Sequence, residues 1–209
     1  KFPYVIGKFA CSSNLYMLNN NTHITNKHSR KVAHLLRFKN QGILTTYKTV
    51  NSDNPKLTCR INGLEKFSPI KIIIDKNLNI KLNSYIINNS ISVKTIIFHN
   101  SKNLSKIQIL KNKGVKLVNF NLDSNKNFDL KKIFKKIYNL GIHTLLIEGG
   151  KTLTYNIISQ KIFNEFYLFK SGKILNNKDK VNVIDVKKQL DKEFKNKYFV
   201  NTFLDKDKL

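Results

Sequence analysis

The chain has 209 residues, of which 41% are hydrophobic, so it is long enough to bury a substantial core in one large domain. Lysine and arginine outnumber aspartate and glutamate by 38 to 13, and the formal net charge of +25 raises nucleic-acid binding as a hypothesis. The basic residues, however, are scattered among Asn and Ile and form no arginine-rich stripe. Two cysteines without Cys/His metal spacing indicate neither a disulfide framework nor a metal site, and no apolar run is long enough to span a bilayer. We therefore expect a protein of a reducing compartment, the cytoplasm, with no metal and no membrane segment.

Short apolar runs alternate along the chain with segments of helical periodicity. The runs predict strands at residues 4–10, 42–46, 70–75, 95–98, 116–120, 144–148 and 165–169. The helical segments are residues 27–38, behind a capping Asn26, and residues 101–113 and 129–140, which Gly114 and Gly141 follow as C-terminal caps. We also expect residues 198–203 to return as an edge strand. Strands that alternate with helices predict an α/β fold with parallel crossovers in a helix-covered sheet.

Residues 49–60 combine an acid, a turn-forming proline, a hydroxyl and a guanidinium. Arg60 offers a planar fork of donors suited to a phosphate, and the turn at Asn54-Pro55 can present Asp53 and Arg60 toward the same side. We expect a short loop that holds an anionic ligand, although Asp-Asn-Pro also marks ordinary surface turns.

A glycine pair further along the chain follows a predicted strand. That strand ends in Glu148, and Gly149-Gly150 then lead into a helix start at Lys151. Glycines let the backbone approach a phosphate closely, and the free N–H groups of a first helical turn favour an anion. The spacing matches neither a Rossmann fingerprint nor a P-loop, and a lone glycine pair after a strand is more often a simple turn.

Four sequence blocks follow one another in an order that matches a known family. They are Lys8-Phe9-Ala10-Cys11-Ser12, Ile24-Thr25 with Leu35-Leu36-Arg37, residues 49–60, and Glu148-Gly149-Gly150. On these blocks the chain, from about residue 1 to residue 169, resembles the reductase domain of riboflavin biosynthesis. That domain is usually the C-terminal half of a bifunctional pyrimidine deaminase-reductase. The chain departs from the family pattern at Ser12-Ser13-Asn14-Leu15, where Ser-Leu-Asp-Gly is usual, and at His23, where an aromatic residue is frequent.

The resemblance implies a dihydrofolate-reductase-like fold with a mostly parallel central sheet flanked by helices. We interpret residues 1–209 as a single reductase domain. Because the chain starts without Met, we expect it to begin inside a longer one, in which a deaminase domain would come first. The resemblance also implies a homodimer.

The resemblance further implies a phosphorylated pyrimidine substrate and NADPH as the cofactor. The residues that match substrate-binding positions are Asn21, Arg37, Leu57, Arg60 and Glu148. Those that match cofactor-binding positions are Ala10, His23, Thr25, Thr49, Asp53, Lys76, Gly150, Lys151, Thr152, Leu153, Thr154, Tyr155 and Asn156. Arg37 and Arg60 would bind the substrate phosphate bidentately, although a basic residue at the end of a helix is also explained by the helix dipole. Lys76 would help to neutralise the extra phosphate that separates NADPH from NADH.

Three charged residues are candidates for a catalytic proton step: Lys8, Asp53 and Glu148. Lys8 lies in a strand of buried character, where an unpaired ammonium is costly, unless the strand is at an edge and the charge reaches water. Glu148 stands at the carboxyl end of a strand, the usual ligand side of an α/β sheet, but acids there also serve as helix-dipole partners. The resemblance favours substrate contact by Glu148, with Lys8 close enough to form an ion pair or to assist proton transfer. The sequence does not rank the three.

The predicted reaction is the NADPH-dependent reduction of 5-amino-6-(5-phosphoribosylamino)uracil to 5-amino-6-(5-phosphoribitylamino)uracil. Hydride would pass to the anomeric carbon after the sugar ring opens. Two alternatives stay open: a related reductase with another pyrimidine or pteridine substrate, and a degenerate reductase fold that serves as a basic nucleic-acid-binding module. The second gains from the charge of +25 and from the loss of the Ser-Leu-Asp-Gly pattern but lacks a recognition motif, so nucleic acid is not the expected partner.

Overall fold

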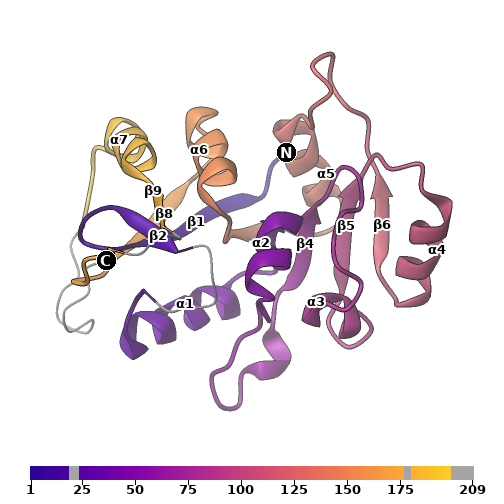
Figure 1. Cartoon of the computed structure of the whole chain (residues 1–209), viewed down its shortest axis with the longest axis horizontal. Coiled ribbons are helices and arrows are strands. Elements are labelled where there is room, and N and C mark those ends of the chain that lie inside the picture. The colour runs from indigo at the N-terminus through magenta and orange to yellow at the C-terminus, as the bar shows by residue number, and fades with distance from the viewer. Residues whose placement is uncertain (19–23, 177–179, 199–209) are drawn as a thin grey trace.

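Seven strands form one parallel sheet at the centre of the computed structural model, which describes residues 1–18, 24–176 and 180–198 (Figure 1). In chain order they are β1 (Tyr4–Cys11), β3 (Gly42–Thr46), β4 (Ile70–Ile74), β5 (Thr95–His99), β6 (Lys116–Asn119), β7 (Thr144–Ile147) and β8 (Glu165–Lys170). Their spatial order is β6-β5-β4-β3-β7-β1-β8, and each neighbouring pair is parallel. The predicted fold class and the predicted strands of this sheet are confirmed.

The position of β7 brings together strands from opposite ends of the chain. From β3 the chain builds outward through β4, β5 and β6, and β7 then returns to lie between β3 and β1. Ile147, the last residue of β7, is opposite Gly7 of β1 and Leu44 of β3. Ligands of open α/β sheets bind outside the carboxyl ends of the strands at such a switch in strand order. Lys8 and Glu148 are both next to this point.

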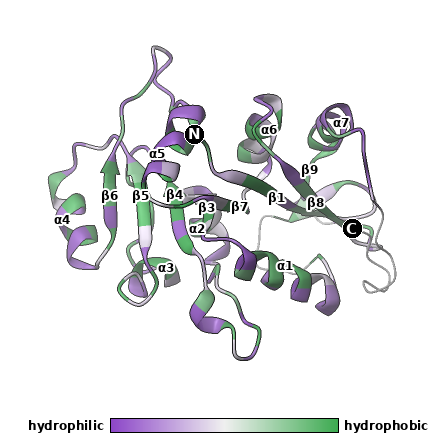
Figure 2. Cartoon of the chain, turned by 180° about the vertical axis from the view of Figure 1, so that it is seen from behind, coloured by the Kyte–Doolittle hydropathy of each residue, from purple (hydrophilic) through white to green (hydrophobic). Residues whose placement is uncertain are grey.

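Helices cover both faces of the sheet. Figure 1 shows α5 (Leu130–Asn139), α6 (Lys151–Ser159) and α7 (Ile184–Glu193) above the sheet, α1 (Lys27–Lys39) and α3 (Tyr85–Asn88) below it, and α4 (Leu104–Asn112) beside β6. Alternate strand residues serve the two sides: Ile72 packs in a cluster with Phe134, whereas Ile73 packs in another with Leu36 and Ile86. The central strands are mostly hydrophobic and the helices are mixed (Figure 2), as expected when a parallel sheet is buried on both faces.

The ends of the predicted helices follow local signals. Asn26 accepts a hydrogen bond from the Ser29 backbone N–H at 2.9 Å and caps α1. Asp129 caps α5 in the same way, through the Lys132 N–H at 3.1 Å. Gly114, with φ of 81°, and Gly141, with φ of 82°, both adopt the left-handed conformation of a C-terminal cap. The predicted caps Asn26, Gly114 and Gly141 are therefore confirmed, and Asp129, expected to be the first helical residue, is instead the N-cap.

Several elements of the structure were not predicted. The segment of residues 49–60 was expected to be a loop, but its first part belongs to α2 (Tyr47–Asp53), which ends at Asn54 in the left-handed region with φ of 41°. A separate antiparallel ribbon joins β2 (Tyr16–Leu18) to β9 (Lys180–Asn182), and a short 3₁₀ helix spans Glu65–Phe67. The expected edge strand at residues 198–203 lies outside the described residues apart from Tyr198, which is not in a strand.

Lys71 interrupts the apolar pattern of β4. Its side chain is 1% exposed, and its ammonium has no hydrogen-bond partner within the described part of the chain. It stands between Ile43 of β3 and Thr95 of β5. Burial lowers the pKa of Lys71 to about 8, because desolvation disfavours the charged form. We therefore expect Lys71 to reduce the stability of the fold at neutral pH.

Candidate active site

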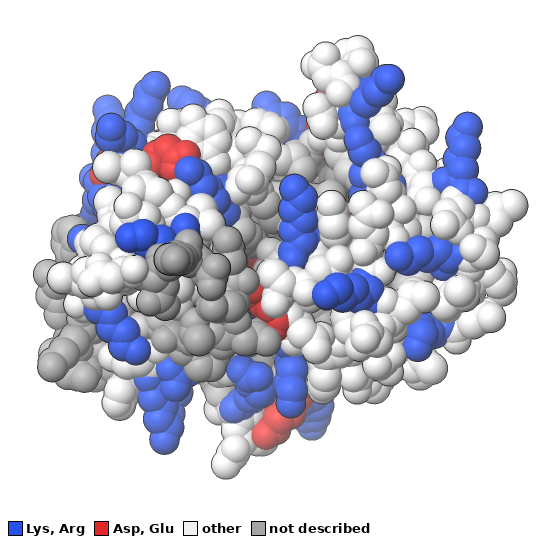
Figure 3. Space-filling model, in the orientation of Figure 1, with Lys and Arg blue, Asp and Glu red and all other residues white. Residues whose placement is uncertain are grey.

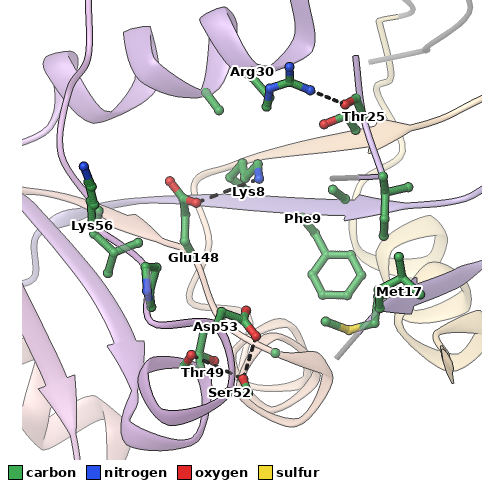
Figure 4. Close-up of a pocket in the computed structure, with 18 of the residues that line it drawn as sticks. Lys8, Phe9, Met17, Thr25, Arg30, Thr49, Ser52, Asp53, Lys56 and Glu148 are labelled. Carbon is green, nitrogen blue, oxygen red and sulfur yellow. Dashed lines mark hydrogen bonds and ion pairs between the residues drawn. The ribbon is translucent and has the colours of Figure 1, made fainter. Parts of the chain in front are cut away.

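A cavity of about 690 Å³ opens at the carboxyl ends of β1, β3 and β7 (Figure 4). Helix α1, helix α2 with the segment that follows it, and β2 supply the other sides. Its basic lining residues are Lys8, Arg30, Arg37, Lys48, Lys56 and Arg60, whereas its acidic ones, among the described residues, are Asp53 and Glu148. A cavity of this size suits a small molecule, and the excess of cations suits an anionic one.

Arg37, Glu148 and Lys8 form a charged cluster in this cavity. Arg37 donates from Nε to Glu148 Oε1 at 2.7 Å and from Nη2 to Oε2 at 3.0 Å, and Lys8 Nζ lies 3.8 Å from Oε2. The three side chains are 11–19% exposed, and Figure 4 shows Lys8 and Glu148 pointing toward each other. The predicted ion pair of Lys8 and Glu148 is confirmed. Arg37 of α1 was predicted to bind the substrate phosphate, but its bidentate pairing with Glu148 was not predicted.

The cluster keeps Glu148 ionised. Burial opposes ionisation of this carboxyl, but the positive charges of Arg37 and Lys8 outweigh it and lower the pKa of Glu148 to about 2. The pKa of Lys8 is lowered by burial and by the like charge of Arg37, against the opposing pull of Glu148. Glu148 is therefore a fixed negative charge at any ordinary pH, and Lys8 is an ammonium that gives up its proton more readily than a lysine in water.

His34 connects Arg60 to this cluster. The imidazole Nδ1 lies 3.1 Å from the Thr58 carbonyl oxygen, to which Arg37 Nη1 also donates at 3.2 Å. Arg60 Nε donates to His34 Nε2 at 3.3 Å. Burial, followed by the charges of Arg37 and Arg60, lowers the pKa of His34 to about 4. The imidazole is thus neutral at neutral pH.

The glycine pair and α2 form the opposite side of the cavity. Gly150 is the N-cap of α6, and no side chain in the described ranges caps that helix. A Cβ added to Gly150 would stand 3.9 Å from Thr49 Oγ1, an ordinary van der Waals distance, so the two residues lie close together. Ser52 Oγ donates to Asp53 Oδ1 at 2.6 Å nearby (Figure 4). Free N–H groups at a helix start bind anions.

The unusual segment Ser12-Ser13-Asn14-Leu15 still makes a tight turn. Ser12 Oγ accepts from the Tyr16 N–H at 3.0 Å and donates to Asn14 Oδ1 at 2.6 Å. Asn14 Oδ1 also accepts from the Leu175 N–H at 3.1 Å, and Leu15 takes the left-handed conformation with φ of 58°. The turn leads into β2, which places Met17 and Leu18 in the cavity lining. An amide and a leucine therefore fill the places of the expected carboxylate and glycine.

The structure brings many of the predicted site residues to this cavity. Those in its lining are Lys8, Ala10, Thr25, Arg37, Thr49, Asp53, Leu57, Arg60, Glu148 and Gly150. Leu57 is buried and holds a left-handed φ of 51°, a strained conformation that recurs at functional sites. The predicted residues Asn21 and His23 lie outside the described residues.

Other predicted residues do not line the cavity. Lys76 Nζ donates to the Lys126 carbonyl oxygen at 3.0 Å, and Lys151 pairs with Asp185 of α7 at 2.9 Å. Leu153 and Thr154 are buried within α6, and the remaining predicted α6 residues are Thr152, Tyr155 and Asn156. Their cofactor-binding roles stay predictions.

Some cavity residues were not predicted from the sequence. Arg30 Nη1 donates to the Thr25 carbonyl oxygen at 2.7 Å (Figure 4), and His34 contacts Arg60. A signal was present, because Arg30, His34 and Arg37 are four and three residues apart and so share one face of α1. Lys48 and Lys56 carried no such signal.

Metal and membrane features are absent from the parts of the chain that the structure describes. Within residues 1–18, 24–176 and 180–198, no group of three or more His, Cys, Asp or Glu side chains is placed to hold a metal ion. No helix there is both long and apolar enough to cross a membrane. Cys11 and Cys59 are both free and buried.

The fold and the cavity together define an α/β domain with a cation-lined ligand site at the carboxyl ends of its parallel strands. The family model described as the RibD C-terminal domain matches residues 3–199, and the chain belongs to that family. It is 36% identical over 152 residues to riboflavin biosynthesis protein RibD of Aquifex aeolicus, which covers 73% of this chain and 40% of that protein. The chain thus spans less than half the length of this relative.

Two further proteins are similar. The 5-amino-6-(5-phosphoribosylamino)uracil reductase of Buchnera aphidicola is 25% identical over 171 residues, covering 75% of this chain and 78% of that protein. The structure of Acinetobacter baumannii RibD superposes with a TM-score of 0.76 at 18% identity, over 99% of this chain and 56% of the other. The structural likeness supports the dihydrofolate-reductase-like fold that the sequence predicted.

Proposed function

We propose that this chain catalyses the NADPH-dependent reduction of 5-amino-6-(5-phosphoribosylamino)uracil to 5-amino-6-(5-phosphoribitylamino)uracil in riboflavin biosynthesis. The observation that carries the proposal is the cluster of Lys8, Arg37 and Glu148 in a cavity that Arg60 also lines, in a chain of the RibD C-terminal domain family. Such a cavity offers a fixed negative charge for sugar hydroxyls, an ammonium for proton transfer, and a guanidinium for a phosphate.

Lys8 is the residue to which we assign the proton step. Opening of the ribosyl ring requires a proton on the ring oxygen as the anomeric C–O bond breaks. The lowered pKa of Lys8 makes its ammonium a better donor than an ordinary lysine, whereas Glu148, with a pKa of about 2, has no proton to give at neutral pH. Glu148 instead accepts hydrogen bonds from sugar hydroxyls and holds Lys8 in place. Asp53 lies on the other side of the cavity, beside Thr49, and is assigned to the cofactor.

Arg60 is the residue to which we assign the substrate phosphate. Arg37 was predicted to share this role, but the edge of its guanidinium that carries Nε and Nη2 is engaged by Glu148. Burial, then the like charges of Arg37 and Arg30, lower the pKa of Arg60 against the opposing charge of Glu148, and a phosphate placed beside Arg60 would offset the remaining repulsion.

The residues around Gly150 fit a dinucleotide phosphate. Gly150 lacks a side chain and lines the cavity at the start of α6. The first N–H groups of that helix have no side-chain cap at Gly150, and the positive end of the helix dipole lies there. A bound nicotinamide would supply the hydride for the anomeric carbon. Thr49 and Asp53 on α2, with Ala10 on β1, would orient its ring beside Lys8.

The nucleic-acid alternative rests on the net charge of +25 and on the altered segment Ser12-Ser13-Asn14-Leu15. Figure 3 shows lysines and arginines spread across the visible face and not gathered in one stripe. Their placement favours general attraction of anions over a defined duplex or single-strand groove. The expected homodimer and the preceding deaminase domain stay predictions.

A turnover assay tests the proposed function. The purified chain is mixed with 5-amino-6-(5-phosphoribosylamino)uracil and NADPH, and loss of NADPH is followed together with the mass of the product. We expect the ribityl product in amounts equal to the NADPH consumed. The analogue with an amino group in place of the oxygen at position 2 of the pyrimidine tests the related-reductase alternative. Titration with a short oligonucleotide at physiological salt tests the binding-module alternative. A folded protein that does not reduce 5-amino-6-(5-phosphoribosylamino)uracil would refute the proposal, whichever result the analogue gives.

A further inference from the structure

The Nε edge of the Arg60 guanidinium contacts His34, a histidine outside the charged cluster of Lys8, Arg37 and Glu148. The Arg60 Nε–H is always a donor, so His34 Nε2, 3.3 Å away, must be the bare, accepting nitrogen. The imidazole proton then lies on Nδ1, where it donates to the Thr58 carbonyl oxygen at 3.1 Å. This assignment satisfies both ring nitrogens at once. It also leaves Arg37 Nη1, 3.5 Å from Nδ1, without a bond to the ring, because both atoms carry hydrogens.

The charges around His34 favour this neutral tautomer. Arg37 is one turn further along α1, and Arg60 approaches from the segment after α2, so the ring is between two guanidinium groups. A protonated imidazole would add a third cation and lose the acceptor that Arg60 needs. The lowered pKa of His34 agrees with that cost. The ring therefore acts as a neutral acceptor beside Arg60.

A guanidinium has two edges that bind an oxyanion bidentately, one with Nε and Nη and one with both Nη atoms. Arg37 uses the first kind of edge on Glu148. In Arg60 that edge is closed by His34, which leaves the terminal edge for a ligand in the cavity. The hydrogen bond of His34 to Thr58 fixes the orientation of the ring. Because His34 belongs to α1, the ring in turn ties the orientation of Arg60 to that helix.

We propose that His34 is a positioning residue that holds Arg60 so that its two terminal nitrogens bind the substrate's phosphate. The inference rests on the proposed function for the identity of the substrate, but not for the presence of a phosphate site. His34 acts through Arg60, whose Nε donates to its ring. It sets the direction of the phosphate-binding guanidinium, and with it the distance of the sugar from Lys8 and Glu148.

The test compares His34→Leu, which removes both hydrogen bonds, with His34→Gln, whose amide keeps one donor for Thr58 and one acceptor for Arg60. His28→Leu is the matched control, because His28 is an exposed histidine on the same helix. Calorimetry measures binding of ribose 5-phosphate, with ribose as the probe without phosphate. We expect His34→Leu to weaken ribose 5-phosphate binding about tenfold, His34→Gln to restore it to within about threefold of the unchanged protein, and ribose binding to stay unchanged.

Coupling to Arg60 separates positioning from a general loss of structure. Arg60→Met should weaken ribose 5-phosphate binding, and adding His34→Leu to it should weaken binding no further, because His34 acts through Arg60. With the full substrate, His34→Leu should raise KM more than it lowers kcat. Additive losses, an ineffective His34→Gln, or normal binding by His34→Leu would overturn the proposal. Ribose 5-phosphate binding by the unchanged protein and the variants can follow this pattern while the unchanged protein turns over no pyrimidine. In that case His34 keeps its role and the proposed reaction fails.

Discussion

Arg37 and Glu148 are 111 residues apart in the chain, yet their side chains meet in a two-bond ion pair of 2.7 and 3.0 Å. The pair joins helix α1 to the end of β7 and places the carboxylate beside Lys8 of β1. It therefore belongs both to the fold and to the candidate active site. Its removal should change stability and activity together.

Acid should weaken the protein through Glu148. The folded pKa of about 2 lies below the ordinary value of 4.5, so the unfolded chain binds more protons between these values. The contribution to the free energy of unfolding is complete above pH 4.5 and is lost as pH falls toward 2, by on the order of 3 kcal/mol. Urea unfolding across this range measures the loss. Glu148→Gln should flatten this part of the profile, and an unchanged profile in that variant would contradict the assignment.

Lys71→Met should stabilise the protein. At pH 7 the lysine must be buried charged or give up its proton, and a methionine of similar volume avoids both costs, which is worth about 1–3 kcal/mol. Because the folded pKa of about 8 lies below 10.5, the stability of the unchanged protein should also rise between those pH values, and that rise should vanish in the variant. Thermal melts measure both effects. The exposed Lys111→Met is the control; an equal melting temperature for Lys71→Met and the unchanged protein would show that the ammonium has partners the account omits.

Arg60→Lys should weaken substrate binding although the charge is conserved. One ammonium cannot reproduce the two parallel hydrogen bonds of a guanidinium, and a tenfold or larger rise in Kd is expected, about 1.4 kcal/mol or more. NADPH affinity should change little. The reverse pattern, with weaker NADPH and normal substrate binding, would move Arg60 to the cofactor side of the cavity.

NADPH should bind more tightly than NADH, because its extra phosphate meets a strongly positive protein. Lys76 was predicted to read that phosphate, and the structure ties its ammonium to the Lys126 carbonyl oxygen. Lys76→Glu should narrow the preference more than Lys102→Glu, an exposed change of the same charge. If both variants narrow it equally, overall charge and not Lys76 sets the preference.

The strands of the large sheet could be predicted because a short apolar run, which is a local signal, marks each of them. The run of residues 70–75, for example, needs no knowledge of its partners to be recognised as a buried strand. The ribbon of β2 and β9 was missed because three-residue strands, 162 or more positions apart in their pairing, carry no local pattern. Helix α2 was missed because it is short and follows β3 directly, at Thr46, without a capping side chain.

Only part of the candidate site was predicted, because contacts between distant segments leave no local pattern in the sequence. Motif matching identified Lys8, Arg60 and Glu148, but the competition of Arg37 between a phosphate and Glu148 depends on distances that spacing in the sequence does not contain. His34 shares a face of α1 with Arg37, but its contact with Arg60 depends on the segment after α2, which brings Arg60 to its ring. Burial of Lys71 was equally hidden, since a lysine inside an isoleucine run reads the same at an edge and at the centre of a sheet.

The most direct test of the account is the single-turnover rate of Lys8→Met with 5-amino-6-(5-phosphoribosylamino)uracil and NADPH both saturating. If Lys8 delivers the proton, the rate should fall by roughly 10²–10⁴ while both ligands still bind. Glu148→Gln should show a loss of similar size, and the double variant should lose little more than either alone, because the two residues act as a pair. A rate for Lys8→Met equal to that of the unchanged protein would contradict the account.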